Sequence, residues 1–79
     1  MVGIVNVKPE NDYKLLVTFS NGKKGIFDVK PYLEVGSVFK ELKDPSVFKS
    51  VRTNEYPTVE WSNGADLCPD CVYAQTKFL

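Results

Sequence analysis

Apolar and polar residues alternate along three stretches of the chain, which predicts strands with one face on a core. The clearest stretch covers residues 13–19, where every odd position is apolar. Residues 2–7 before it are rich in β-branched side chains, and residues 23–29 after it return with further apolar positions. The sequence therefore predicts three consecutive strands, the first of which ends at Lys8-Pro9.

The turn between the second and third predicted strands can be placed from the faces it creates. A two-residue loop of Asn21 and Gly22 would set Leu15 opposite an acidic side chain and mix the two faces. A three-residue loop that also includes Ser20, with Gly22 in the left-handed conformation, sets Leu15 opposite Phe27 and keeps one face apolar. We therefore predict the three-residue loop.

Short helical turns are predicted in the middle of the chain, where the apolar spacing changes. Ser37 is expected to cap a helix that continues through residues 38–42. Asp44 is expected to cap a second single turn, with Pro45 as its first helical residue. Residues 49–54 then form a weaker predicted strand.

The densest structural signals lie in residues 58–73. Residues 58–61 alternate as a strand that ends at the only tryptophan, and a Ser-Asn-Gly turn follows, as in the first hairpin. Asp66 or Cys68 is expected to cap a helix that begins at Pro69. The residues given structural roles in the two turn regions are Asn21, Gly22, Trp61, Asn63, Gly64, Asp66, Pro69, Asp70 and Tyr73.

The C-terminal helix is expected to lean on the sheet, because apolar side chains recur at helical spacing. These apolar positions are Cys71, Val72, Ala74 and Phe78. Trp61 and Tyr73 are expected to anchor the core, since aromatic side chains bury large areas.

Together these elements predict one α+β domain over residues 1–79, with a small, mainly antiparallel sheet covered on one face by short helices. A chain of this length buries only about 60–65% of its unfolded surface, so its margin of stability is small. One Trp, four Tyr and five Phe partly offset this. A homodimer, the other common remedy for a small core, is left open.

Charge and composition narrow the classes of partner. Ten Lys and Arg balance ten Asp and Glu, and no run of like charge exceeds two, so a nucleic-acid partner is not expected. The chain opens with no signal pattern and has no apolar stretch of bilayer length, so a cytoplasmic location without membrane attachment is expected. The absence of histidine excludes His-based triads and His-metal sites.

Cys68 and Cys71, separated by Pro69 and Asp70, are the one constellation with chemical content. A C-x-x-C at a helix start favours a reactive thiolate, although Asp70 and the missing thioredoxin-like surroundings oppose a redox role. A zinc site needs four ligands, of which the pair supplies two. The favoured interpretation is a buried Cys71 and a cap-region Cys68 without chemistry. No cofactor, resident metal or catalytic residue is expected.

Several segments form a pattern that can be compared with known families. They are Val5 to Pro9, Tyr13-Lys14-Leu15, Phe19-x-Asn21-Gly22, Phe27-Asp28, Tyr32-Leu33, Val38-Phe39-x-x-Leu42-x-Asp44-x-x-x-Phe48 and Trp61-x-Asn63-Gly64-Ala65-Asp66-Leu67-x-Pro69-Asp70-x-x-Tyr73. This pattern resembles the small bacterial domain of unknown function 2442 family, and it spans nearly the whole chain.

The resemblance implies a compact α+β domain and little more about activity. Some members are fused to a helix-turn-helix DNA-binding domain, and others are encoded beside another small protein, which suggests toxin-antitoxin-like or regulatory pairs. It supplies no catalytic residues. The family pattern does not generally require cysteine at positions 68 and 71, so thiol chemistry would be particular to this chain.

The leading hypothesis is therefore a non-enzymatic protein-interaction or regulatory module whose partner is another small protein. An exposed surface at Tyr56 or Tyr73 would mark the partner site. The alternative is a thiol redox or zinc-binding protein that uses Cys68 and Cys71.

Overall fold

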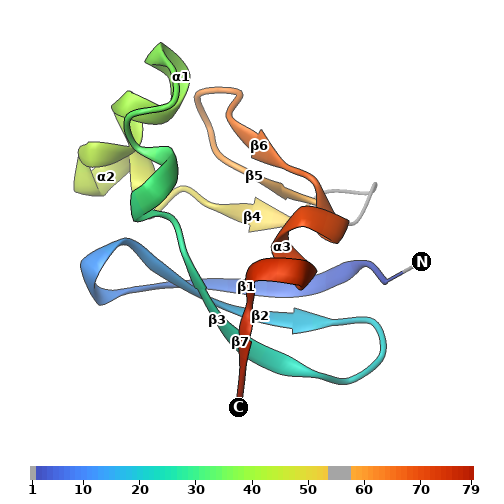
Figure 1. Cartoon of the computed structure of the whole chain (residues 1–79). Coiled ribbons are helices and arrows are strands. Elements are labelled where there is room, and N and C mark those ends of the chain that lie inside the picture. Colours follow the sequence, from blue (N-terminus) through green and yellow to red (C-terminus); the bar gives the residue numbers. More distant parts are fainter. Residues whose placement is uncertain (1, 54–57) are drawn as a thin grey trace.

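The strands of the protein form two antiparallel sheets, one above the other in Figure 1. The computed structural model describes residues 2–53 and 58–79. In the first sheet the strand order is β1-β2-β3-β7, with bounds Ile4–Glu10, Lys14–Phe19, Lys24–Asp28 and Lys77–Phe78. In the second sheet the order is β4-β5-β6, with bounds Arg52–Thr53, Val59–Glu60 and Asp66–Leu67.

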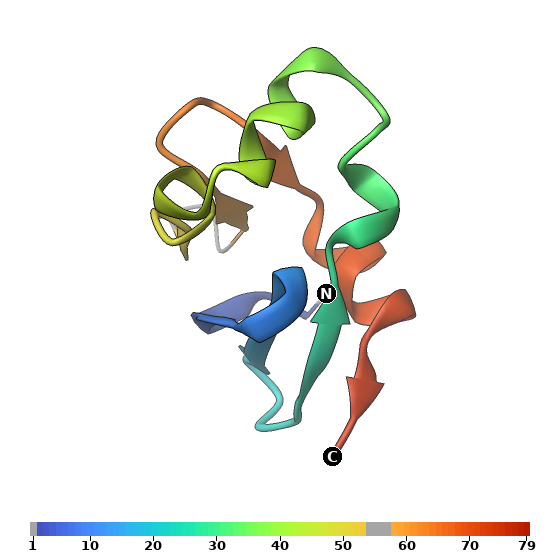
Figure 2. The same ribbon diagram turned by 90° about the vertical axis from the view of Figure 1, so that its left-hand side faces the viewer.

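Short helices lie on the same side of the first sheet as the second sheet does (Figures 1 and 2). The α-helices are α1 (Ser37–Lys40), α2 (Pro45–Phe48) and α3 (Pro69–Gln75). The 3-10 turns are η1 (Asn11–Tyr13), η2 (Lys30–Tyr32) and η3 (Glu41–Lys43). The predicted α+β class is confirmed, and the strands are divided between two sheets.

The strand β1 is longer than the sequence pattern predicted. It continues through Lys8 and Pro9 to Glu10, with Pro9 opposite Leu15 in the antiparallel register. Because β1 pairs only with β2, it is an edge strand, where a proline can face its missing N–H away from the sheet. The prediction that Lys8-Pro9 ends the strand was wrong for this reason.

The first hairpin has the predicted three-residue turn. Leu15 lies opposite Phe27, and the Val29 N–H donates to the Tyr13 carbonyl at 2.9 Å. Gly22 has a φ of 87°, which is the left-handed conformation that glycine adopts without a steric penalty. The predicted register is confirmed, and it places the apolar face of β2 and β3 in the core.

The turn after Trp61 repeats the hydrogen bonds of the turn after Phe19. In each, the aromatic residue donates its N–H to the carbonyl four positions on, at 2.8 Å after Phe19 and 2.9 Å after Trp61. Gly64 has a φ of 92° and takes the place of the first glycine. Because this turn closes a second hairpin, Asp66 lies in β6 opposite Glu60, and the expectation that Asp66 caps a helix was wrong.

The starts of α1 and α2 show how local chemistry sets the short helices. Asp44 caps α2 as predicted, because its carboxylate accepts the Ser46 N–H at 2.9 Å and Pro45 is the first helical residue. Gly36, with extended backbone, is the N-cap residue of α1. Ser37 is already helical, so its predicted capping role was wrong.

The helix α3 buries less apolar surface than its sequence spacing predicted. Cys68 is its N-cap residue but makes no side-chain capping bond, and Val72 is fully buried. Cys71 and Ala74 are exposed, and Phe78 belongs to β7. Only one of the four predicted side chains therefore leans inward, because the chain leaves the helix early to join the first sheet.

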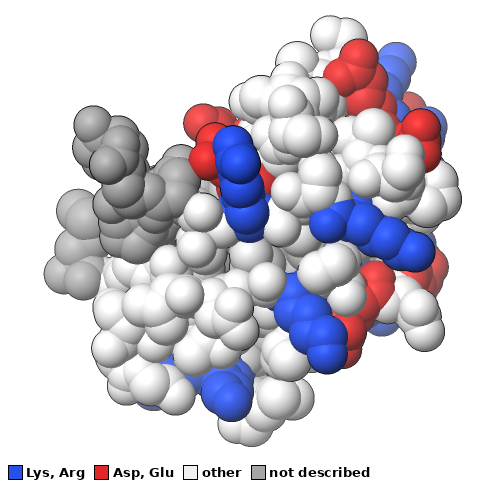
Figure 3. Space-filling model, turned by 180° about the vertical axis from the view of Figure 1, so that it is seen from behind, with Lys and Arg blue, Asp and Glu red and all other residues white. Residues whose placement is uncertain are grey.

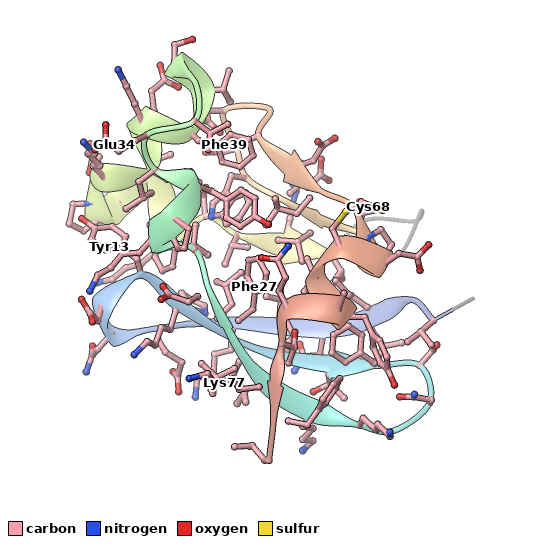
Figure 4. All side chains as sticks on the ribbon, in the orientation of Figure 1. Tyr13, Phe27, Glu34, Phe39, Cys68 and Lys77 are labelled. Atoms are coloured by element: carbon pink, nitrogen blue, oxygen red, sulfur yellow. The ribbon has the colours of Figure 1, made fainter. Side chains whose placement is uncertain are left out.

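Trp61 fills the core between the two sheets and is 1% exposed. Its indole N–H donates to the Phe48 carbonyl at 3.0 Å, and its ring lies 6.5 Å from that of Phe39 and 6.4 Å from that of Phe48. Phe27 reaches this region from the first sheet (Figure 4). Tyr73, the second predicted anchor, is partly buried against the same core.

The strand β4 occupies part of the predicted strand at residues 49–54. Asn54, at the end of that prediction, lies outside the described residues, and so does Tyr56, one of the two suggested partner-site aromatics.

Gly25 allows the last strand to lie close to β3. A Cβ at this position would stand 2.4 Å from Thr76 Cγ2 and 2.6 Å from the Lys77 carbonyl oxygen. The second neighbour is a backbone atom, which cannot shift without moving β7. A glycine is therefore required here by close packing, and the sequence pattern alone gave no sign of it.

Replacing Gly25 with alanine is expected to destabilise the protein by about 1–3 kcal/mol, because the added methyl group overpacks this contact. The matched control is Gly36→Ala, where a Cβ meets no atom within 4 Å and the backbone is extended. That variant is expected to change the free energy of unfolding by less than about 1 kcal/mol. Urea denaturation followed by Trp61 fluorescence measures both, and equal midpoints would contradict the close approach.

Candidate functional site

Cys68 and Cys71 lie at the start of α3, and both side chains are exposed. Figure 4 labels Cys68 where β6 gives way to the helix. The prediction that Cys71 is a buried small side chain was wrong. The helix turns Val72 into the core, so the neighbouring residue faces outward.

The two thiols differ in acidity. Backbone N–H groups of Cys71 and Asp70 lower the pKa of Cys68 from its ordinary value, against a small opposing effect of the Asp70 carboxylate. The pKa of Cys71 is raised, chiefly because its thiol is hydrogen-bonded to Cys68. The thiolate is the nucleophilic form of cysteine, so Cys68 is the more reactive of the two at neutral pH.

The cysteine pair does not have the ligands of a complete zinc site. Within residues 2–53 and 58–79, no group of three or more Cys, Asp or Glu side chains is placed to hold a metal ion. Since zinc takes four ligands, Cys68 and Cys71 would need the others from a second molecule.

Asn21 and Asn63 each tie a hairpin turn to a helix. In both turns the side-chain oxygen accepts the backbone N–H two residues on, at 3.1 Å. The Asn21 amide donates to the Tyr73 hydroxyl of α3 at 3.2 Å. The Asn63 amide donates to the Val38 carbonyl at 2.9 Å and to the Glu41 carboxylate at 2.8 Å. These contacts are architectural, and each fixes a helix against a turn.

The two aspartates of the C-terminal stretch do not form a common site. Asp66 lies in β6, whereas Asp70 lies in the first turn of α3 directly after Pro69. Asp66 is exposed and Asp70 is half-buried. The position of Asp70 is favourable at the positive end of the helix dipole, which accounts for it without chemistry.

The first sheet has an outer face that the other described elements leave uncovered (Figures 1 and 2). Side chains alternate along strands, so Leu16 and Ile26 point away from the core. They lie opposite each other, and the register continues the row to Lys8 on one side and Lys77 on the other. We define the outer face by the alternate residues Lys8, Lys14, Leu16, Lys24, Ile26 and Lys77.

The outer face carries more positive than negative charge, although the chain as a whole is neutral. Its four lysines are accompanied by Glu10 and Asp28 in the same alternation. Ion pairs among the described residues lie elsewhere: Lys30–Asp12 at 2.7 Å, Lys43–Glu34 and Arg52–Glu60 at 3.4 Å. In Figure 3 the signs are mixed over the upper part, whereas the lowest edge, at the first sheet, shows basic side chains alone.

The charge of this face was not predicted, because the sequence shows it no run of like charge. Lysines at alternate strand positions never form a run, yet a strand places them on one side. The predicted pairing of Leu15 with Phe27 already implied that Leu16, Lys14 and Lys24 share the opposite face.

Comparison with known families decides what kind of chain this is. A family model described as a protein of unknown function (DUF2442) matches residues 4–78. The chain belongs to the DUF2442 family. No curated protein and no solved structure matches this DUF2442 chain. The family description names no activity, so a function for the DUF2442 chain has to be argued from its own residues.

The lengths of the helices bear on the expectation of a protein without membrane attachment. Among the described residues of the DUF2442 chain, none of the helices is both long and apolar enough to span a bilayer.

Cys68 of the DUF2442 chain is expected to react with iodoacetamide faster than Cys71, because its pKa is lowered and that of Cys71 is raised. The rate at Cys68 should level off at a lower pH than the rate at Cys71, since each rate follows the thiolate fraction. Mass spectrometry of the alkylated peptides measures both rates. In denaturing urea the difference should disappear, and a folded protein in which Cys71 reacts as fast as Cys68 would contradict the assignment.

Proposed function

We propose that this DUF2442 chain is a non-enzymatic protein-interaction module that binds another protein through its outer face. The observation that supports it is the pair of half-buried apolar side chains, Leu16 and Ile26, with a lysine at each end of their row. Protein interfaces combine an apolar centre with a polar rim, and this face has both.

The charge of the outer face indicates what kind of protein would bind. Its lysines favour a partner with an acidic surface, because complementary charge speeds association and disfavours wrong partners. Another small acidic protein, as in a toxin-antitoxin-like or regulatory pair, fits this requirement. A homodimer through the outer face is disfavoured, since two copies would bring like charges together.

A thiol function through Cys68 and Cys71 is the second candidate, favoured by the exposure of both sulfurs. In a redox role Cys68 would attack a disulfide substrate and Cys71 would complete the exchange, whereas a zinc site would need ligands from a second molecule. The helix α3 lies on the other side of the first sheet from the outer face (Figure 1). A variant with serine at both positions therefore separates the two functions.

Site-specific photo-crosslinking in the native host tests the interaction directly. A photoreactive amino acid at position 26, on the outer face, is expected to form a covalent adduct with an acidic protein. The matched control is position 35, where Val35 is 69% exposed away from this face, and no adduct is expected there. The double Cys68→Ser, Cys71→Ser variant should give the same adduct as the unmodified chain.

Two results would contradict the proposed function. One is the same set of adducts from positions 26 and 35, which would indicate unspecific contact. The other is an adduct from position 26 that contains nucleic acid and no protein.

A further inference from the structure

A hollow of about 520 Å³ lies at one corner of the first sheet, between the first hairpin turn and the last strand. Gly22, Lys23 and Lys24 line it from the turn, and Phe78 and Leu79 line it from the C-terminal segment. It therefore has two ammonium groups beside an apolar wall. Lys24 also belongs to the outer face, so the hollow continues the surface assigned to partner binding.

The apolar wall of the hollow is held in place by ring contacts. The Phe78 ring lies 5.9 Å from the ring of Phe19 and 5.0 Å from that of Tyr73, while Tyr73 meets Phe19 edge-on at 4.8 Å. Lys23 Nζ stands 5.5 Å from the centre of the Phe78 ring. Phe78 nevertheless remains 41% exposed, so a large part of a fixed aromatic ring faces the hollow.

The hollow adjoins a free sheet edge. The strand β7 pairs only with β3, as Figure 2 shows, and Phe78 lies opposite Gly25. The Leu79 N–H donates to the Lys24 carbonyl at 3.0 Å, which makes Phe78 the residue whose own N–H and C=O point outward. An extended segment can add to such an edge through main-chain hydrogen bonds and place alternate side chains in neighbouring pockets.

We infer that the occupant is an extended segment of a partner protein that carries acidic residues beside one large apolar residue. This inference rests on the proposed function and names its partner. The apolar residue would lie against Phe78, and the carboxylates would meet Lys23 and Lys24. Charge complementarity supports the choice, because no acidic side chain lines the hollow and neither lysine takes part in an ion pair within the described residues.

Edge protection and self-association each account for less of this surface. A lysine on an edge strand protects the edge from unwanted pairing, which gives a reason for Lys77 but none for Phe78 or for Leu79, which is 85% exposed. A second copy that paired through its own β7 would bring the lysines of both hollows to one shared edge, where they would repel.

The experiment measures binding of a fluorescent eight-residue peptide that alternates Glu with Val and has one central Phe. A control peptide has Lys in place of each Glu, and a twelve-nucleotide single-stranded DNA serves as a polyanion without apolar side chains. The protein variants are Lys23→Glu with Lys24→Glu and the matched control Lys40→Glu with Lys49→Glu, which changes the net charge equally from sites elsewhere. Fluorescence anisotropy gives each dissociation constant.

The acidic peptide is expected to bind the unmodified protein in a saturable manner, and the Lys-containing peptide is not. Reversal at Lys23 and Lys24 should weaken binding about tenfold, and the matched control should change it by less than about twofold. No saturable binding, equal losses in both variants, or tighter binding of the DNA would overturn the inference. The crosslinking result at position 26 does not depend on the hollow, so a failure here leaves the proposed function standing.

Discussion

The structure depends on the burial of Trp61 between the two sheets. The residue closes the second hairpin through its backbone, and its indole fills the core while donating to the Phe48 carbonyl at 3.0 Å. Removing a buried ring of this kind typically costs about 3–5 kcal/mol. In a domain whose total stability is on the order of 5–15 kcal/mol, that loss would remove much of the margin. The second sheet and the helices α1 and α2 are therefore organised around one side chain.

This arrangement leaves the two faces of the first sheet in different environments. The inner face carries Leu15 and Phe27 and is buried under everything that Trp61 holds together. The outer face keeps Leu16 and Ile26 half-buried among lysines. Because the second sheet and the helices all pack on the inner side, the small core leaves one sheet face free for another molecule. The short helix α3 likewise turns a single side chain fully inward, which leaves both cysteines in solvent.

Much of the fold follows from local rules that a sequence displays. The register of the first hairpin, the cap at Asp44 and the two Ser-Asn-Gly turns each depend on neighbouring residues alone, so they could be predicted. The course of β1 through Pro9 depends on its position at a sheet edge, and the need for glycine at position 25 depends on a strand distant in sequence. Neither is visible in a local pattern.

The candidate site was harder to predict than the fold. The Cys68–Cys71 pair stands out in the sequence, but its exposure depends on how the helix is rotated against the core. The outer face leaves a weak trace in the sequence, because its lysines are spread over four strands. Only the pairing of those strands brings them into one surface.

Lysine footprinting of the complex isolated from the native host tests the central claim most directly. An amine-reactive reagent is applied to the free protein and to the complex, and the rate at each lysine is measured by mass spectrometry. The account predicts that Lys8, Lys14 and Lys77 become protected in the complex while Lys40 and Lys49 react as before. Protection at Lys40 and Lys49 in place of the outer face, or no protection anywhere, would contradict it.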